Sequence, residues 1–158
     1  MADGKNMEKE VFTVFSELAE TIGYSPIHGK IIAALIVEDH PLPLQEIAKR
    51  TRYSTGMISL SLDLLEVLGV IKKIKKTGDR KLYVSLEGDL LEILKKAVIV
   101  KVKKGIVNSL EDIAEKKKKA VSLNDENGRR SAELLSTLES EVRRLEKYIN
   151  LLSGIRLP

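Results

Sequence analysis

The sequence predicts a mainly α-helical fold that contains one small β-hairpin. Apolar residues recur every three or four positions along most of the 158 residues, which is the spacing of one helix face. Residues 70–86 differ, because two short runs rich in β-branched residues flank a glycine-containing turn there. Four helices are therefore expected before the hairpin, and two longer ones after it.

Two helices are predicted in the first part of the chain. The first spans residues 7–22 and carries Phe12 and Phe15 on an apolar stripe. The second runs from Pro26 to about Val37, because Ser25 is a favoured N-cap residue and proline is favoured at the first helical position. Apolar residues cover most of the circumference of this second helix. We therefore expect neighbouring elements to bury it on more than one side.

Two shorter helices and a tight turn are predicted next. One helix spans residues 43–50, and the other spans about 54–68 with Ser54 as its cap. The second of them buries an apolar series at helical spacing, formed by Ile58, Leu62, Leu65 and Leu68. Arg52 stands in the turn between them, at a position that usually favours glycine because the backbone there tends toward positive φ. Arg52 must either adopt this conformation at some cost or avoid it through a longer turn.

The β-hairpin joins strands 70–75 and 81–86 through the turn 76–80. Residues 72–81 hold one acidic side chain, Asp79, and six basic ones: Lys72, Lys73, Lys75, Lys76, Arg80 and Lys81. This segment alone accounts for the positive net charge of the chain, which is +4. Such a charge suits phosphate groups, although a solvated lysine-rich hairpin would have the same composition.

Two long helices are predicted after Gly88. The first continues to the lysine run 116–119, with Gly105 as a candidate bend. After the turn-forming residues 124–128, the last helix carries apolar residues at alternating three and four spacing: Leu135, Leu138, Val142, Leu145, Ile149 and Leu152. This pattern is typical of a coiled-coil seam. We expect it to pair two chains, and the alternative is a hairpin with residues 89–121 of the same chain.

The order of elements in residues 25–88 is that of a winged helix-turn-helix domain. In such a domain the second helix of the helix-turn-helix, the recognition helix, enters the DNA major groove. Residues 1–24 are then an N-terminal helix that forms part of a dimer interface through Phe12 and Phe15. Residues 89–158 form a helical, coiled-coil dimerisation region. The chain would bury its long apolar stripes by forming a symmetric dimer.

Four segments resemble the MarR superfamily of regulators, especially its GbsR-like branch: Leu44–Ala48, Ser54–Ile58, Leu65–Ile71 and Gly78–Lys81. The resemblance spans roughly residues 24–86. It implies a homodimeric transcriptional regulator that binds double-stranded DNA. It also implies that Asp79 orients the wing arginine, Arg80, through a charge-assisted hydrogen bond.

The expected DNA contacts come from the recognition helix in the major groove and from the wing on the backbone and minor groove. The family often has a basic residue where this chain has Leu60 or Leu64, so base readout would depend on Thr55, Ser59 and Ser61. The full set of expected contact residues is Arg52, Ser54, Thr55, Met57, Ser59, Ser61, Lys75, Lys76, Arg80 and Lys81.

Catalytic and cofactor chemistry finds no support in the sequence. Cysteine is absent, and the two histidines, His28 and His40, lack the spacing of a metal site or a catalytic triad. No phosphate-binding glycine motif is present. We therefore expect no cofactor, no metal site and no enzymatic activity.

The expected partners are double-stranded DNA, a second copy of the chain and, as an open possibility, a small-molecule effector. Neither a signal peptide nor an apolar stretch of membrane-spanning length is visible, which predicts a cytoplasmic protein without a membrane partner. High Lys and Glu with a single Gln is the composition described for hyperthermophiles. The alternative function is a winged-helix module for protein interaction or architecture, without a specific operator.

Overall fold

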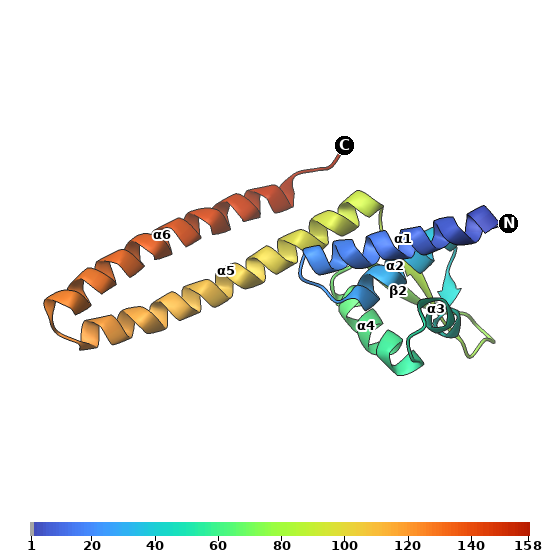
Figure 1. Ribbon diagram of the computed structural model, residues 1–158, viewed down its shortest axis with the longest axis horizontal. Coiled ribbons are helices and arrows are strands. Elements are labelled where there is room, and N and C mark those ends of the chain that lie inside the picture. Colours follow the sequence, from blue (N-terminus) through green and yellow to red (C-terminus); the bar gives the residue numbers. More distant parts are fainter. Residues whose placement is uncertain (1) are drawn as a thin grey trace. The chain divides into compact units, whose positions relative to one another are not determined.

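The structure, a computed structural model, describes residues 2–158 of the chain and divides into two compact units (Figure 1). The first unit extends through Ala97, and the second runs from Val98 to Pro158. The first contains helices α1 (Ala2–Thr21), α2 (Pro26–Glu38), α3 (Leu44–Thr51) and α4 (Thr55–Val67), and strands β1 (Leu42–Pro43), β2 (Ile71–Lys75) and β3 (Leu82–Leu86). Helix α5 (Leu90–Ser122) begins in the first unit and ends in the second, which also contains α6 (Glu126–Gly154). The mainly helical fold class with a small antiparallel sheet is confirmed.

The core of the first unit is aliphatic and has α2 at its centre. Ile31 of α2, Ile47 of α3, Ile58 of α4 and Val84 of β3 are completely buried. The expectation that α2 is buried on more than one side is confirmed, because Ala33 is completely buried as well. Burial of this kind contributes roughly 1.5–3 kcal/mol for each large aliphatic side chain.

Helices α1 and α2 make a close backbone contact. A Cβ atom built at Gly29 of α2 would overlap the main-chain carbonyl oxygen of Phe15 in α1. No side chain fits at this position without separating the two helices. Glycine at 29 thus allows α1 to lie directly against α2.

The sheet has three antiparallel strands in the order β1-β3-β2. The hairpin of β2 and β3 agrees with the sequence prediction, but β1 was not predicted, and Pro43, the approximate start predicted for the third helix, ends this strand and caps α3. In β1, Leu42 lies opposite Val84 and Pro43 lies opposite Tyr83. Proline has no N–H to donate. An edge strand tolerates it because the outer side of such a strand has no neighbouring strand to bond.

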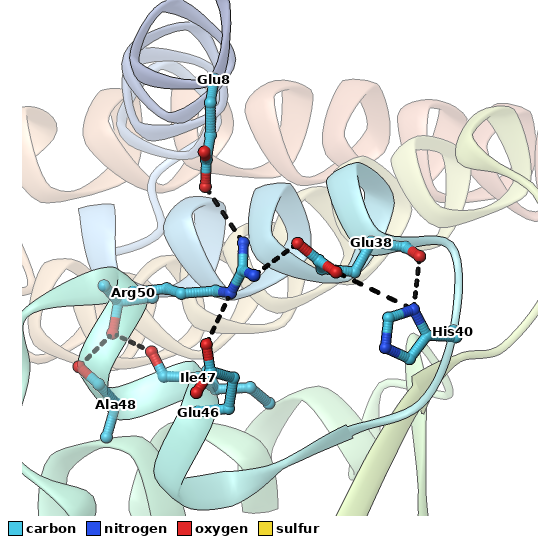
Figure 2. A network of polar contacts seen from close by, with 8 residues as sticks. Glu8, Glu38, His40, Glu46, Ile47, Ala48 and Arg50 are labelled. Carbon is cyan, nitrogen blue, oxygen red and sulfur yellow. Dashed lines mark hydrogen bonds and ion pairs between the residues drawn. The ribbon is translucent and has the colours of Figure 1, made fainter. Parts of the chain in front are cut away.

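Arg50 of α3 lies within reach of three carboxylates from three helices (Figure 2). Its Nη1 is 3.1 Å from Oε1 of Glu8 in α1, and its Nη2 is 2.5 Å from Oε1 of Glu38 in α2. Its Nε donates to Oε1 of Glu46, one turn earlier in α3, at 3.1 Å. One guanidinium group therefore joins α1, α2 and α3, and its planar arrangement of donors suits several carboxylates at once.

The second unit is a pair of helices that lie side by side, formed by α6 and the part of α5 after Ala97 (Figure 1). Ile106, Ile113 and Ala120 of α5 and Ile149 of α6 are buried. Lys117 Nζ lies 2.8 Å from Glu139 Oε2 across the pair. Of the two pairings that the sequence left open for α6, the hairpin within one chain is present. Helix α5 continues without interruption through Gly105.

Replacing Arg50 with methionine is expected to lower the free energy of unfolding by about 1–3 kcal/mol, because three carboxylates would remain without their cation. The loss is smaller than for a fully buried ion pair, since the Arg50 side chain is 23% exposed. Urea unfolding followed by circular dichroism measures it. The control, Lys49→Met, removes an exposed charge from the same helix and should change stability by less than about 0.5 kcal/mol. Equal losses from both variants would contradict a specific role for the network.

Candidate nucleic-acid interface

The turn between α3 and α4 contains a non-glycine residue in the left-handed conformation. Arg52 has φ 60° and ψ 29° and ends α3. Of the two alternatives that the sequence left open, Arg52 adopts the positive φ and does not avoid it by a longer turn. This conformation is unfavourable by roughly 1–2 kcal/mol for a residue with a side chain. The Arg52 side chain is exposed. Ser54 then caps α4, because its hydroxyl oxygen accepts a hydrogen bond from the Met57 backbone N–H at 3.2 Å.

Helix α4 has one buried face and one exposed face. Ile58, Leu62 and Leu65 point into the core, while Thr55 and Ser59 are exposed. Ser61 is only 8% exposed, so the expectation that it belongs to the outward face is wrong. The reason is helical geometry, since Ser61 lies three residues after Ile58 and four before Leu65 and so shares their side.

Four large apolar side chains on the outward side of α4 are exposed. Met57 was an expected contact residue, but Leu60, Leu64 and Val67 were not assigned to the site. Leu60 is 74% exposed and Val67 is 84% exposed. The same periodicity that buries Ile58 and Leu62 places Leu60 outward, so the signal was present in the sequence.

The tip of the wing carries exposed cations from both strand ends. Lys75 ends β2 and lies opposite Leu82 in the register of the hairpin. Lys76, Arg80 and Lys81 lie in the connecting turn and are exposed, as is Lys75. All four expected wing contacts therefore gather at one end of the sheet.

Asp79 organises this tip. Its Oδ1 accepts a hydrogen bond from the Lys81 backbone N–H at 2.9 Å, and its Oδ2 accepts one from the Tyr83 hydroxyl at 2.9 Å. The Lys81 and Tyr83 hydrogen bonds lower the pKa of Asp79, and the Asp79 hydrogen bond raises the pKa of Tyr83. Lys76 Nζ lies 4.0 Å from the centre of the Tyr83 ring. The donors observed on the two oxygens of Asp79 are thus the Lys81 amide and the Tyr83 hydroxyl, and not the expected partner, Arg80.

Lys73 connects the wing to α4. Its Nζ lies 2.5 Å from Oδ1 of Asp63 and 3.0 Å from Oε2 of Glu66, both on the exposed side of α4. These two hydrogen bonds raise the pKa of Lys73. The ion pairs hold β2 beside the second half of α4. They also neutralise part of the negative charge that α4 would otherwise present.

The expected dimer residues take different positions in the two units. Phe12 packs against the core of the first unit, and Phe15 lines an apolar cavity there. In α6, Leu138 is 50% exposed and Leu145 is 44% exposed, whereas Ile149 is buried. The remaining expected residues, which are half-buried, are Leu135, Val142 and Leu152.

The apolar cavity lies inside the first unit, among side chains of α1, α2, α4 and the first turns of α5. Phe15, Ile22, Leu68 and Leu94 are among the residues that line it. Its volume is about 40 Å³, far below the roughly 300 Å³ or more of ordinary ligand pockets. It is therefore a packing gap of the core in this conformation.

The two histidines lie in different surroundings. His28 lines the apolar cavity, and His40 Nδ1 lies 2.6 Å from the Glu38 carbonyl oxygen in the loop after α2 (Figure 2). Within residues 2–158, no three acidic or imidazole side chains are grouped so that they could hold a metal ion. No helix in this described range is both long enough and apolar enough to cross a membrane.

The Lys81 amide is expected to report the titration of Asp79. Because folding lowers the pKa of Asp79, its stabilisation of the wing tip is complete above the pKa of an unfolded aspartate. It is lost as the pH falls through the lowered folded-state pKa. An NMR titration of the Lys81 amide shift should therefore have its midpoint below the ordinary aspartate pKa, and Asp79→Asn should abolish the transition. A midpoint at or above the ordinary value would contradict the geometry of the tip.

The comparisons with known proteins concern the fold. No protein-family model and no curated protein matches the chain. The solved structure described as "a transcriptional regulator" is 19% identical, with a TM-score of 0.62 over 93% of this chain and 95% of that one. Two others are NadR in complex with 4-hydroxyphenylacetate (18% identical, TM-score 0.44, 98% of this chain and 92% of that one) and a mutant of S. aureus MepR bound to an oligodeoxyribonucleotide (18%, 0.45, 86% and 93%). The likeness to the first structure shows that the chain has the fold of a winged helix-turn-helix regulator.

Proposed function

We propose that this protein is a homodimeric transcriptional regulator that binds specific sites in double-stranded DNA. The observation that carries the proposal is the combination, in one compact unit, of an exposed helix α4 and a cationic wing that Lys73 fixes beside it. The fold likeness to a transcriptional regulator supports the same assignment. We further propose that the protein is a member of the MarR superfamily, of its GbsR-like branch, and that it works in the cytoplasm and has no enzymatic activity.

The wing supplies the affinity that does not depend on sequence. Lys75, Lys76, Arg80 and Lys81 are exposed at its tip, and none of them has an ion-pair partner among the described residues. Such cations bind phosphates and release the counterions condensed on DNA. Arg80, in the connecting turn, suits a narrow minor groove, where the negative potential is enhanced.

Helix α4 supplies the contacts to bases. Its N-terminal half, residues 55–62, carries no charged side chain and exposes the hydroxyls of Thr55 and Ser59. In helix-turn-helix proteins the N-terminal residues of the second helix contact the base edges. The positive end of the helix dipole also lies there, which favours the approach of the negatively charged duplex.

A second copy of the chain completes the proposed site. After α6 packs on α5, it still exposes a row of large side chains on the adjacent side, formed by Leu134, Leu138, Leu145 and Tyr148. Symmetric dimers bury apolar stripes of this kind. A two-fold dimer presents two α4 helices to half-sites one helical turn apart, about 34 Å, which predicts a pseudo-palindromic operator.

A winged-helix protein-interaction module is the second candidate. The observation in its favour is the exposed apolar side of α4, where Leu64 and Val67 accompany Met57 and Leu60. In this reading the basic wing is incidental or binds an acidic protein. Complex formation with protein that does not respond to salt would support it.

Duplex affinity is expected to fall steeply with salt and to depend on Arg80. Arg80→Ala should weaken binding to all sequences alike and reduce the slope of log affinity against log salt by about 1. Fluorescence anisotropy with the duplex upstream of its own gene and with a scrambled duplex, each at several salt concentrations, measures both quantities.

A matched control removes the same charge from a solvent-exposed position elsewhere. Lys118→Ala in α5 should leave affinity and slope unchanged. Binding to the upstream duplex alone identifies a specific regulator, and equal weak binding to both duplexes points to an architectural role. No binding at low salt contradicts DNA recognition and leaves the protein-interaction module.

The double variant Leu138→Glu and Leu145→Glu is expected to convert a dimer into a monomer, because it places carboxylates on the exposed row of α6. Analytical ultracentrifugation over a range of concentrations measures the change. The control Ser140→Glu adds a charge at an exposed polar position of the same helix and should leave the dimer intact. A wild-type protein that is monomeric at all concentrations would contradict the proposed assembly.

A further inference from the structure

The outward side of α4 is apolar at the place where base edges would be contacted. Met57 is 51% exposed and Leu60 is 74% exposed, and they lie three residues apart in the N-terminal half of the helix. Single exposed apolar residues are common on protein surfaces. Two large ones that neighbour each other on a helix, in a segment without charge, are instead expected to become covered in a complex.

Gly56 lies on the same side, one turn before Leu60. Glycine in a helix is less stable than alanine by about 0.5–1 kcal/mol. A Cβ atom at residue 56 would meet no atom within 4 Å, and Gly56 is not among the residues with positive φ. Neither packing nor backbone conformation of the folded chain therefore requires glycine here. Its missing side chain leaves room for another molecule to approach the helix backbone.

Building on the duplex binding proposed above, we propose that this side of α4 reads thymine, with Met57 and Leu60 against the 5-methyl groups in the major groove. The 5-methyl group of thymine is the apolar group that a standard base pair presents there. Gly56 lets the helix come close enough for these contacts. The hydroxyls of Thr55 and Ser59 flank the apolar side and bind the neighbouring base edges. The preferred partner is therefore an A·T-rich duplex.

Charge distribution favours a duplex over an apolar protein helix as the occupant. The wing cations belong to the same unit as α4, and phosphates lie on both sides of a major groove. A partner helix would use the whole length of α4, but in its second half Leu64 and Val67 alternate with Asp63 and Glu66. These carboxylates repel phosphates and are only partly neutralised by Lys73. The methyl contacts are therefore confined to the first half of the helix.

The test compares duplexes that differ only in methyl groups. The first pair is alternating dA-dT against alternating dA-dU, and the second is alternating dG-dC against its 5-methylcytosine form, which carries a methyl group at the same position of the groove. Each methyl group contacted should raise affinity about fourfold, from the burial of one CH₂-sized group. The second pair separates methyl recognition from the narrow minor groove of A·T sequences.

Three variants assign the effect to residues. The double variant Met57→Ala and Leu60→Ala should remove the preference for methylated duplexes in both pairs, and Val67→Ala, on the second half of the same side, should leave it unchanged. Gly56→Ala should raise thermal stability but weaken binding to every duplex severalfold. If Gly56 had a purely structural role, a variant that is more stable would not also bind the duplex more weakly. Met57 and Leu60 are exposed, so the double variant should keep the melting temperature of the natural sequence, which a thermal melt verifies.

The outcomes separate this inference from the function on which it rests. Methyl preference in both pairs, lost in the double variant Met57→Ala and Leu60→Ala and kept in Val67→Ala, supports it. Salt-sensitive binding of equal strength to methylated and unmethylated duplexes overturns it and leaves DNA binding in place. Preference that persists in the double variant Met57→Ala and Leu60→Ala overturns the assignment to this side of α4. No binding to any duplex at low salt overturns the proposed function as well.

Discussion

The orientation of α4 depends on burial of aliphatic side chains from four elements in one core. Ile31, Ile47, Ile58 and Val84 are completely buried, and each comes from a different helix or strand. Because Ile58 is fixed in this core, the opposite side of α4 must face outward. A closely packed interior does not allow such a helix to rotate gradually, so its exposed side is defined as sharply as its buried side.

Polar contacts then fix the positions of surface segments that the core does not hold. Ser54 sets the first turn of α4, Lys73 holds β2 beside the second half of the helix, and Asp79 closes the tip of the hairpin. Each acts at the surface, where a single hydrogen bond or ion pair contributes on the order of 1 kcal/mol or less. Their main effect is positional, because they limit the conformations of segments that have little apolar surface of their own to bury.

Hydrophobic periodicity predicted the helices and the hairpin, but it could not predict contacts between residues that are distant in the sequence. Strand β1 has only two residues, and it exists because Leu42 lies opposite Val84. The partners of Lys73 belong to another element. Ser61 was misplaced because a step of one residue moves a helix position from the exposed to the buried side. The apolar pattern of α6 could not tell whether its partner lies in the same chain or in another.

The Arg50 cluster has a consequence for the temperature at which the first unit holds together. Dehydrating charged groups becomes less unfavourable on heating, while the stabilisation from each unit of buried apolar area levels off. A guanidinium that binds carboxylates of α1, α2 and α3 therefore contributes more to the free energy of unfolding, relative to the aliphatic core, at high temperature than at low temperature. Helix α1, which packs closely against α2 at Gly29, would be retained by this arrangement at temperatures where apolar contacts alone become insufficient.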